Sequence, residues 1–154
     1  MSTISPMSAA YRARVGLLEA IRSALADEKV DVETGWTGAP GSADWVAMGD
    51  ISVDADPRTI GPRRSWDETI SLEVNVGSWA AGRGDEAVAK AYARADVLLS
   101  LIQTHVTTGD NTTLGDVVAW CLPGSAEWAG TEYDDGFQVE IAATFICSHR
   151  VRAA

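Results

Sequence analysis

Hydrophobic positions along the chain follow two spacings, and the first of them predicts two helices. Between Ser8 and Asp27 apolar residues recur every three or four positions, which is typical of an amphipathic helix. The same spacing predicts a second helix from Asp85 to about Thr107, with Asp85 as its N-cap. The apolar stripes are Tyr11, Val15, Leu18, Ile21 or Arg22, and Leu25 in the first helix, and Val88, Tyr92, Ala95, Leu98 or Leu99, Ile102 and Val106 in the second.

Alternation of apolar and polar residues, the second spacing, predicts strands. They are expected over 29–34, 45–53 with a candidate bulge at Gly49, 68–77 and 137–147. In the segment 68–77, Ile70, Leu72, Val74 and Val76 alternate with polar residues. One face of this strand therefore meets water or a partner, which fits an antiparallel sheet covered on one side only.

The stretch TTLGDVVAWCLPG (112–124) breaks the alternation. Its apolar run Val117–Leu122 starts just after a turn at Gly115 and stops at Pro123. Because both faces of this run are apolar, we expect a strand in the centre of the sheet. Asp54–Arg64 and Pro123–Gly136 are expected to be exposed loops, and the ends of the chain, about 1–7 and 150–154, a flexible start and a short tail.

The predicted order is helix, three strands, helix, two strands, within a single domain spanning 1–154. We expect an α+β two-layer sandwich, in which two helices cover one face of a mainly antiparallel five-stranded sheet. The two helix stripes and the inward faces of the strands would share one hydrophobic core.

Charge narrows the function classes. The chain has 12 Lys and Arg against 22 Asp and Glu, a net charge of −10, and no Lys or Arg between Arg94 and Arg150. Nucleic-acid binding depends on cations that neutralise phosphates, so specific binding of DNA or of an anionic membrane is not expected. The longest apolar run has six residues, far below the roughly 20 of a membrane-spanning helix, and the start does not read as a secretion signal. Synthesis in a cytosol is expected.

No sequence pattern of catalysis is found. There is no phosphate-binding loop, no Gly-x-Ser-x-Gly elbow, and no metal-ligand spacing around Cys121, Cys147, His105 and His149. We therefore expect no catalytic residue, no cofactor, no metal and no enzymatic activity. The two cysteines are expected to be buried thiols, and a disulfide stays open if their strands pair.

Two surface clusters are candidates for partner contacts. Arg58, Arg63 and Arg64 beside Trp66 form a locally basic segment, which is either a docking loop for an acidic neighbour or a solvated loop. Glu127, Glu132, Asp134 and Asp135 form an acidic segment, which is either solvated or a contact surface. The six tryptophans gather near strand ends and loops, as in protein interfaces or sugar-binding surfaces, although core packing accounts for some of them.

Several stretches together resemble the tail terminator proteins of long-tailed bacteriophages. They are VGLLEAIRSAL, WVAMGDI, ETISLEVNV, GRGDEAVAKAYARADVLLSLIQTHV, TTLGDVV and FQVEIAATFICSHRV, within 10–152. The resemblance implies a virion protein, assembled in the host cytoplasm, that forms a hexameric ring. Its partners would be copies of itself, the major tail tube protein and the head-side connector or head-closure protein, and DNA would pass through the ring.

An acid-lined opening would repel DNA phosphates and keep DNA moving. Six copies at −10 each would carry −60 in total. Two alternatives to the terminator remain open at this point: another head-closure or tube protein of the same virion, and a small ligand-binding or enzymatic α+β domain with tryptophans lining a pocket.

Overall fold

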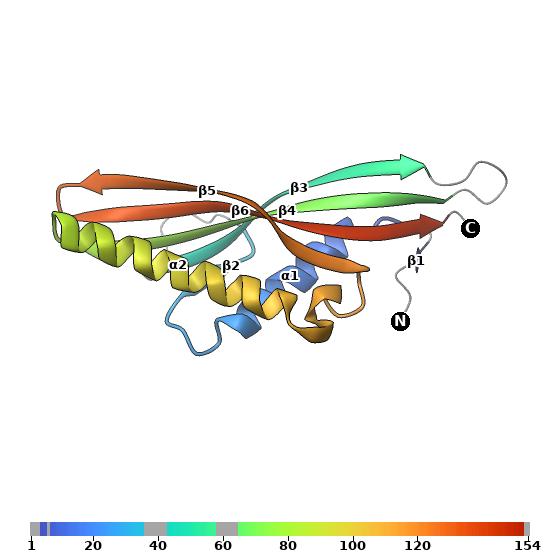
Figure 1. The fold of residues 1–154 in the computed structure, drawn as a ribbon, viewed down its shortest axis with the longest axis horizontal. Helices are drawn as coiled ribbons and strands as arrows, with labels where there is room; N and C mark the ends of the chain where they lie inside the picture. Colours follow the sequence, from blue (N-terminus) through green and yellow to red (C-terminus); the bar gives the residue numbers. More distant parts are fainter. Residues whose placement is uncertain (1–3, 6, 36–42, 58–64, 153–154) are drawn as a thin grey trace.

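The computed structural model describes residues 4–5, 7–35, 43–57 and 65–152 of the chain. They form an α+β two-layer sandwich in which two helices lie on one side of a long, twisted sheet (Figure 1). The predicted fold class is confirmed, and so is the order of the main elements. A very short first strand, β1, and a 3-10 turn, η1, were not predicted.

Four long strands form the body of the sheet. They are β3 (Asp44–Pro57), β4 (Ser65–Ala81), β6 (Gly136–Arg152) and β5 (Trp120–Tyr133). They lie in the order β3, β4, β6, β5, and each pairs antiparallel with its neighbour. Two short strands run parallel to them at the margins: β2 (Asp31–Glu33) beside the start of β3, and β1 (Ile4–Ser5) beside the end of β6.

Helix α2 (Asp85–Thr107) packs over β4, β6 and β5, and α1 (Ala10–Ala24) packs over β3 and against α2. The inward side of α2 is largely alanine in its first half and larger aliphatic residues in its second: Ala87, Ala91, Ala95, Leu98, Leu99, Ile102 and Val106. Gly84 precedes α2 as the N-cap residue, so Asp85 is the first helical residue and not the cap. None of the described helices is both long and apolar enough to cross a membrane.

The apolar stripe predicted for the first helix is partly wrong. Tyr11 is 71% exposed, whereas the buried face contains Ala13, Leu17 and Ile21. Leu18, Ile21 and Leu25 of the predicted stripe are buried, so the error lies in the first half of the helix, where Ala13 and Leu17, not Tyr11 and Val15, face the core. The small Ala13 side chain lets the helix lie close to the sheet, a role that a search for large apolar residues overlooks.

The alternation in β4 predicted the two faces of the sheet correctly. Ile70, Leu72, Val74 and Val76 are fully buried under the helices. On the opposite face Ser71, Glu73 and Asn75 are half-buried. We call this opposite face, which no described helix covers, the open face.

Several strands are longer than predicted. β3 continues through Asp54–Pro57, which was expected to be a loop, and β6 continues through Arg150–Arg152, which was expected to be a tail. The predicted bulge at Gly49 is confirmed by a register shift between Met48 and Ile51.

The largest correction concerns β5. The segment Pro123–Gly136, expected to be a loop, consists of most of β5, a two-residue turn at Asp134–Asp135, and the first residue of β6. Moreover β5 pairs only with β6 among the described strands, so it lies at the edge of the sheet and not in its centre. Val117 and Val118 precede this strand, which begins at Trp120.

Candidate interaction surface

The acidic residues predicted as one loop are spread along the β5–β6 hairpin. Asp134 and Asp135 form its turn, where the carbonyl of Asp135 accepts a hydrogen bond of 3.0 Å from the amide of Gly82. Glu132 and Glu127 lie on β5, and all four side chains are exposed. Glu127 and Glu132 are five positions apart along the strand, a span of about 17 Å, so the four do not converge. The described residues contain no group of three or more His, Cys, Asp or Glu that could hold a metal ion.

The basic cluster is described only at its end. Arg58, Arg63 and Arg64 lie outside the described residues, and the structure therefore places only Trp66. Trp66 is part of β4, between Pro57 of β3 and Val151 of β6, and it is half-buried. It belongs to the sheet and not to a loop.

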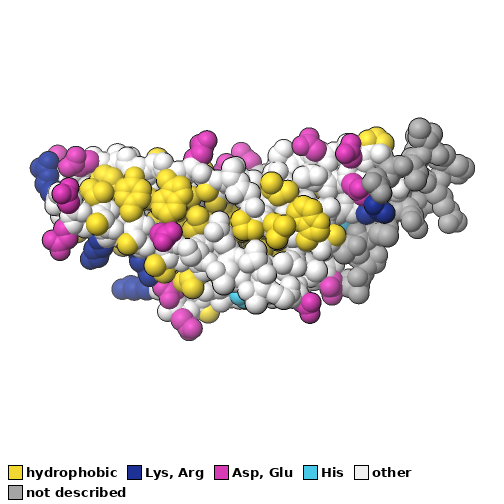
Figure 2. Space-filling view, viewed as in Figure 1, with side chains coloured by type: hydrophobic (Ala, Val, Ile, Leu, Met, Phe, Trp, Pro, Cys, Tyr) yellow, Lys and Arg dark blue, Asp and Glu magenta, His cyan; other side chains and the backbone are white. Residues whose placement is uncertain are grey.

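Aromatic side chains form a cluster between α2 and the outer half of β5. Tyr92 stacks on Trp128 with ring centroids 6.2 Å apart and an angle of 12°, and its ring lies 5.9 Å from Phe137. Trp128 remains 41% exposed and Tyr92 37% exposed. Figure 2 shows hydrophobic side chains gathered in a band along the molecule, over β5 and the adjoining side of α2.

A β-bulge divides β5 and changes which side chains face the helices. The register shifts by one residue between Pro123 and Ala126. Before the bulge, Trp120 and Leu122 share a face with Ser148 and Ile146, which is the open face, and they are 41% and 43% exposed. After the bulge Trp128 shares the helix face with Ile141. As a result β5 offers half-exposed apolar side chains on both sides of the sheet.

A second aromatic contact lies on the open face, next to the hairpin turn. Trp79 contacts Tyr133 with ring centroids 5.6 Å apart, and Tyr133 is 46% exposed. Leu122 and Tyr92 were not predicted as surface residues, whereas Tyr133 lies in the segment 123–136 that was expected to be exposed. Leu122 is exposed because β5 is an edge strand, a position that depends on pairings that the sequence pattern does not reveal.

The outer edge of β5 is poorly protected against pairing with another strand. Natural edge strands usually carry Lys, Pro or a short length that discourages such pairing. β5 has 14 residues, includes two tryptophans, and contains no Lys or Arg; its one proline, Pro123, lies at the bulge. The two-residue turn makes Tyr133 and Gly136 a hydrogen-bonded pair. Along an antiparallel ladder such pairs alternate with non-hydrogen-bonded pairs, whose amides point away from the partner strand. Therefore the backbone amides of Trp128, Gly130 and Glu132 point away from β6.

A second unpaired edge lies on the other side of the sheet. β2 pairs with β3 only as far as Ala47, so beyond that point no described strand pairs with the outer edge of β3. The Gly49 carbonyl on this stretch accepts a hydrogen bond of 3.4 Å from Nε of Arg14. Ile51 and Val53 on this stretch are 36% and 42% exposed. The exposed acids Asp50, Asp54 and Asp56 alternate with them.

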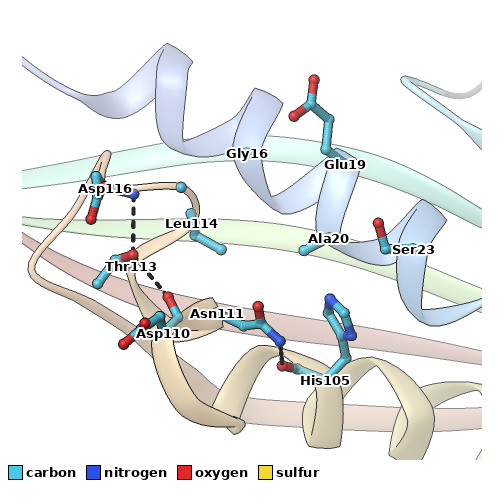
Figure 3. A pocket seen from close by; sticks show the side chains of 11 residues that line it. Gly16, Glu19, Ala20, Ser23, His105, Asp110, Asn111, Thr113, Leu114 and Asp116 are labelled. Carbon is cyan, nitrogen blue, oxygen red and sulfur yellow. Dashed lines mark hydrogen bonds between the residues drawn. The ribbon is translucent and has the colours of Figure 1, made fainter. Parts of the chain in front are cut away.

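A hollow of about 430 Å³ lies between α1 and the segment that follows α2 (Figure 3). Its polar groups mostly bond to their own turn: the Asn111 side-chain amide donates to the carbonyl of His105 at 3.0 Å, and the Thr113 hydroxyl to the carbonyl of Asp110 at 2.9 Å. The backbone amide of Asp116 in turn donates to that hydroxyl. These bonds hold the turn together, and the residues lining the hollow include no tryptophan.

Buried polar contacts attach the start of α1 to the sheet. The Glu68 carboxylate accepts a hydrogen bond of 2.7 Å from the amide of Ala9 and lies 3.0 Å from Nδ1 of His149. Glu68 and His149 are 2% and 1% exposed. Such a pair is costly to break because the remaining partner would stay buried without compensation. His149, which lies beyond the strand predicted over 137–147, is thus part of the packed interior.

A second polar network attaches α2. Arg94 donates to Asp44 at 2.6 Å and lies 2.9 Å from Glu28, and Ser78 donates to the other Asp44 oxygen. The hydrogen bond to Asp44 raises the pKa of Arg94 above its ordinary value. The network fixes the helix relative to β3 and β4.

Cys121 and Cys147 lie directly opposite each other on β5 and β6. Both are buried and both are free thiols, as expected. Their hydrogen bond, together with burial, raises the pKa of Cys121 well above that of an exposed thiol. The Cys121 thiol is therefore protected from ionisation while the hairpin is packed.

Comparison with known proteins identifies no family. No family model matches the chain, and no curated protein matches it in sequence. Among solved structures it is similar to a chain of one described as "Virion of native gene transfer agent (GTA) particle", with 11% sequence identity and a TM-score of 0.40. The match covers 88% of this chain and 93% of that chain. A similarity at this level does not indicate a function.

Proposed function

We propose that this protein is a structural component of a phage-type virion, which caps the tail tube as a ring. The ring would end growth of the tube and join it to the head-side connector, and DNA would pass through it without specific binding. The protein would act by assembly, with no catalytic residue and no cofactor. The observation that carries the proposal is the long unprotected edge of β5, because a strand with half-exposed Trp120 and Trp128 is suited to be covered by a partner.

The family resemblance supports the specific role. The stretches that resemble tail terminators form α1, β3, β4, α2, the turn after α2, and β6. They therefore include both helices and three of the four long strands, and not a single local motif. β5 departs most from what the pattern predicted, and it also carries the exposed apolar side chains of Trp120, Leu122, Trp128 and Tyr133.

A closed ring needs two different surfaces on each subunit, one on each side. The chain has apolar side chains at two opposite edges of the sheet, on β5 and on β3. The β5–β6 turn and the far end of β3 lie at opposite ends of the long axis (Figure 1). In the proposed ring one of these ends would meet the tube and the other the connector. Glu127, Glu132, Asp134 and Asp135 are the candidates to face the opening or a neighbouring protein. Glu127 and Glu132 lie on opposite faces of β5, so only one of these two could face the opening.

The position of the protein in a virion tests this proposal. Particles made by the virus that encodes the chain are incubated with an antibody raised against the purified protein and viewed by electron microscopy. We expect label at the head-side end of the tail only. Label along the whole tube would indicate a tube protein instead, and particles without any label would contradict a virion role.

A further inference from the structure

Two unpaired sheet edges of the same chain are complementary in direction. β3, β4, β6 and β5 alternate in direction across the sheet, so the two outermost strands, β3 and β5, run opposite ways. When a second copy is placed beside the first in the same orientation, its β3 lies antiparallel to the β5 of the first. An even number of long strands thus lets a sheet continue from copy to copy without a parallel junction.

We infer that β5 of one copy pairs with the outer edge of β3 of the next copy, to form a continuous antiparallel sheet. The outward amides of Trp128, Gly130 and Glu132 would bond to the stretch of β3 after Gly49, which pairs with no described strand on its outer side. The inference rests on the proposed ring for the side-by-side arrangement of copies, and it names the strands that make the contact.

Exposed apolar side chains lie beside both the β5 edge and the β3 edge. Trp128, packed on Tyr92, is 41% exposed beside the β5 edge, while Ile51 and Val53 are 36% and 42% exposed on β3. Cross-strand contacts between aromatic and β-branched side chains stabilise antiparallel sheets. Both exposed sets are therefore of the kind that a strand-to-strand contact buries.

Acidic residues on both strands should make this contact depend on the salt concentration. Asp54 and Asp56 on β3 and Glu127 and Glu132 on β5 are all exposed acids. Like charges on adjoining strands oppose pairing, and salt screens them. We therefore expect self-association to strengthen as the salt concentration rises.

Two substitutions of Glu132 distinguish the contribution of its backbone amide from that of its carboxylate. Glu132→Pro removes an outward amide and leaves the β5–β6 ladder intact, because proline is tolerated where the amide faces away from the sheet. Glu132→Ala removes the same carboxylate and keeps the amide. We expect Glu132→Pro to weaken self-association about tenfold, measured by analytical ultracentrifugation of the full chain, and Glu132→Ala to leave it equal or stronger. Equal unfolding midpoints of the two variants would show that folding is not the cause of any difference.

Hydrogen exchange locates the contact. We expect amides in 126–132 and in 48–57 to exchange more slowly in the assembled protein than in the dilute monomer. Protection of β5 alone would indicate two-fold pairing of β5 with itself and would overturn the inference. A chain that stays monomeric at high concentration and high salt, or a Glu132→Pro variant that assembles normally, would overturn it as well. None of these results bears on where the protein lies in a virion, so a failure here is distinct from a failure of the proposed function.

Discussion

At the scale of single residues, glycines allow tryptophans to lie flat on the sheet. A Cβ on Gly77 would lie 2.0 Å from the Trp45 ring, and one on Gly136 would lie 2.2 Å from the Trp79 ring. Trp45 is therefore 4% exposed even though it lies on the open face. The paired occurrence of Trp and Gly reflects this packing, and it accounts for tryptophans that the sequence suggested as surface residues.

Replacing Gly77 with alanine tests this packing. The new methyl group would displace the Trp45 ring, and we expect the free energy of unfolding to fall by about 1–3 kcal/mol, measured by urea denaturation. Gly35→Ala is the matched control, because nothing lies within 4 Å of a Cβ at that position, and its effect should stay within about 0.5 kcal/mol. Equal effects of the two changes would show that the ring does not depend on Gly77.

At the scale of helices and strands, the sequence correctly predicted the features that depend on the spacing of hydrophobic residues. Helix α2 begins and ends where predicted, and β4 buries the residues that its alternation indicated. The stripe of α1 was misassigned in its first half, where Ala13 and Leu17 are buried and the larger Tyr11 is exposed. The pattern could not reveal β5, since PGSAEWAGTEY lacks alternation and contains proline and glycine.

The glycines of β5 have a packing reason that only the paired strands reveal. A Cβ on Gly130 would lie 2.5 Å from Phe137 and 2.8 Å from the Tyr92 hydroxyl, and one on Gly124 would lie 3.0 Å from Ile146. These glycines indicate close approach of neighbouring side chains and not turns. For the same reason, the candidate acidic loop could be predicted as exposed but not as part of a strand.

The paired thiols of β5 and β6 predict a dependence of stability on pH. Because the hydrogen bond to Cys147 and burial raise the folded-state pKa of Cys121, its thiol form stabilises the fold fully below the unfolded-state pKa of about 8.5. Above that pH the unfolded chain releases this proton and the folded chain retains it. We expect the free energy of unfolding to fall by about 1.4 kcal/mol per pH unit from this thiol.

Urea denaturation between pH 7 and 10 measures this slope. The variant Cys121→Ala should be less stable at neutral pH, because it leaves space in the core, but should show a shallower decline at alkaline pH. An identical pH slope in both proteins would show that Cys121 does not contribute to it.

At the scale of the whole molecule, the described residues form an elongated sheet with helices on one side, and β5 and most of β3 pair with no described strand on their outer sides (Figure 1). Most of its half-exposed aromatic side chains lie along β5, as Trp120, Trp128 and Tyr133. The net charge of −10 opposes close contact with nucleic acid, and in the proposed ring we expect it to weaken contacts between copies at low salt. These properties suit a subunit that assembles with its own kind around a passage for DNA.

Tail length tests the proposed role most directly. Lysates of the virus with the gene deleted are viewed by electron microscopy, with the wild-type protein or its Glu132→Ala variant supplied from a plasmid in parallel. The account predicts abnormally long tails without attached heads when the protein is absent, and tails of normal length when either protein is supplied. Tails of normal length attached to heads in its absence would contradict the account.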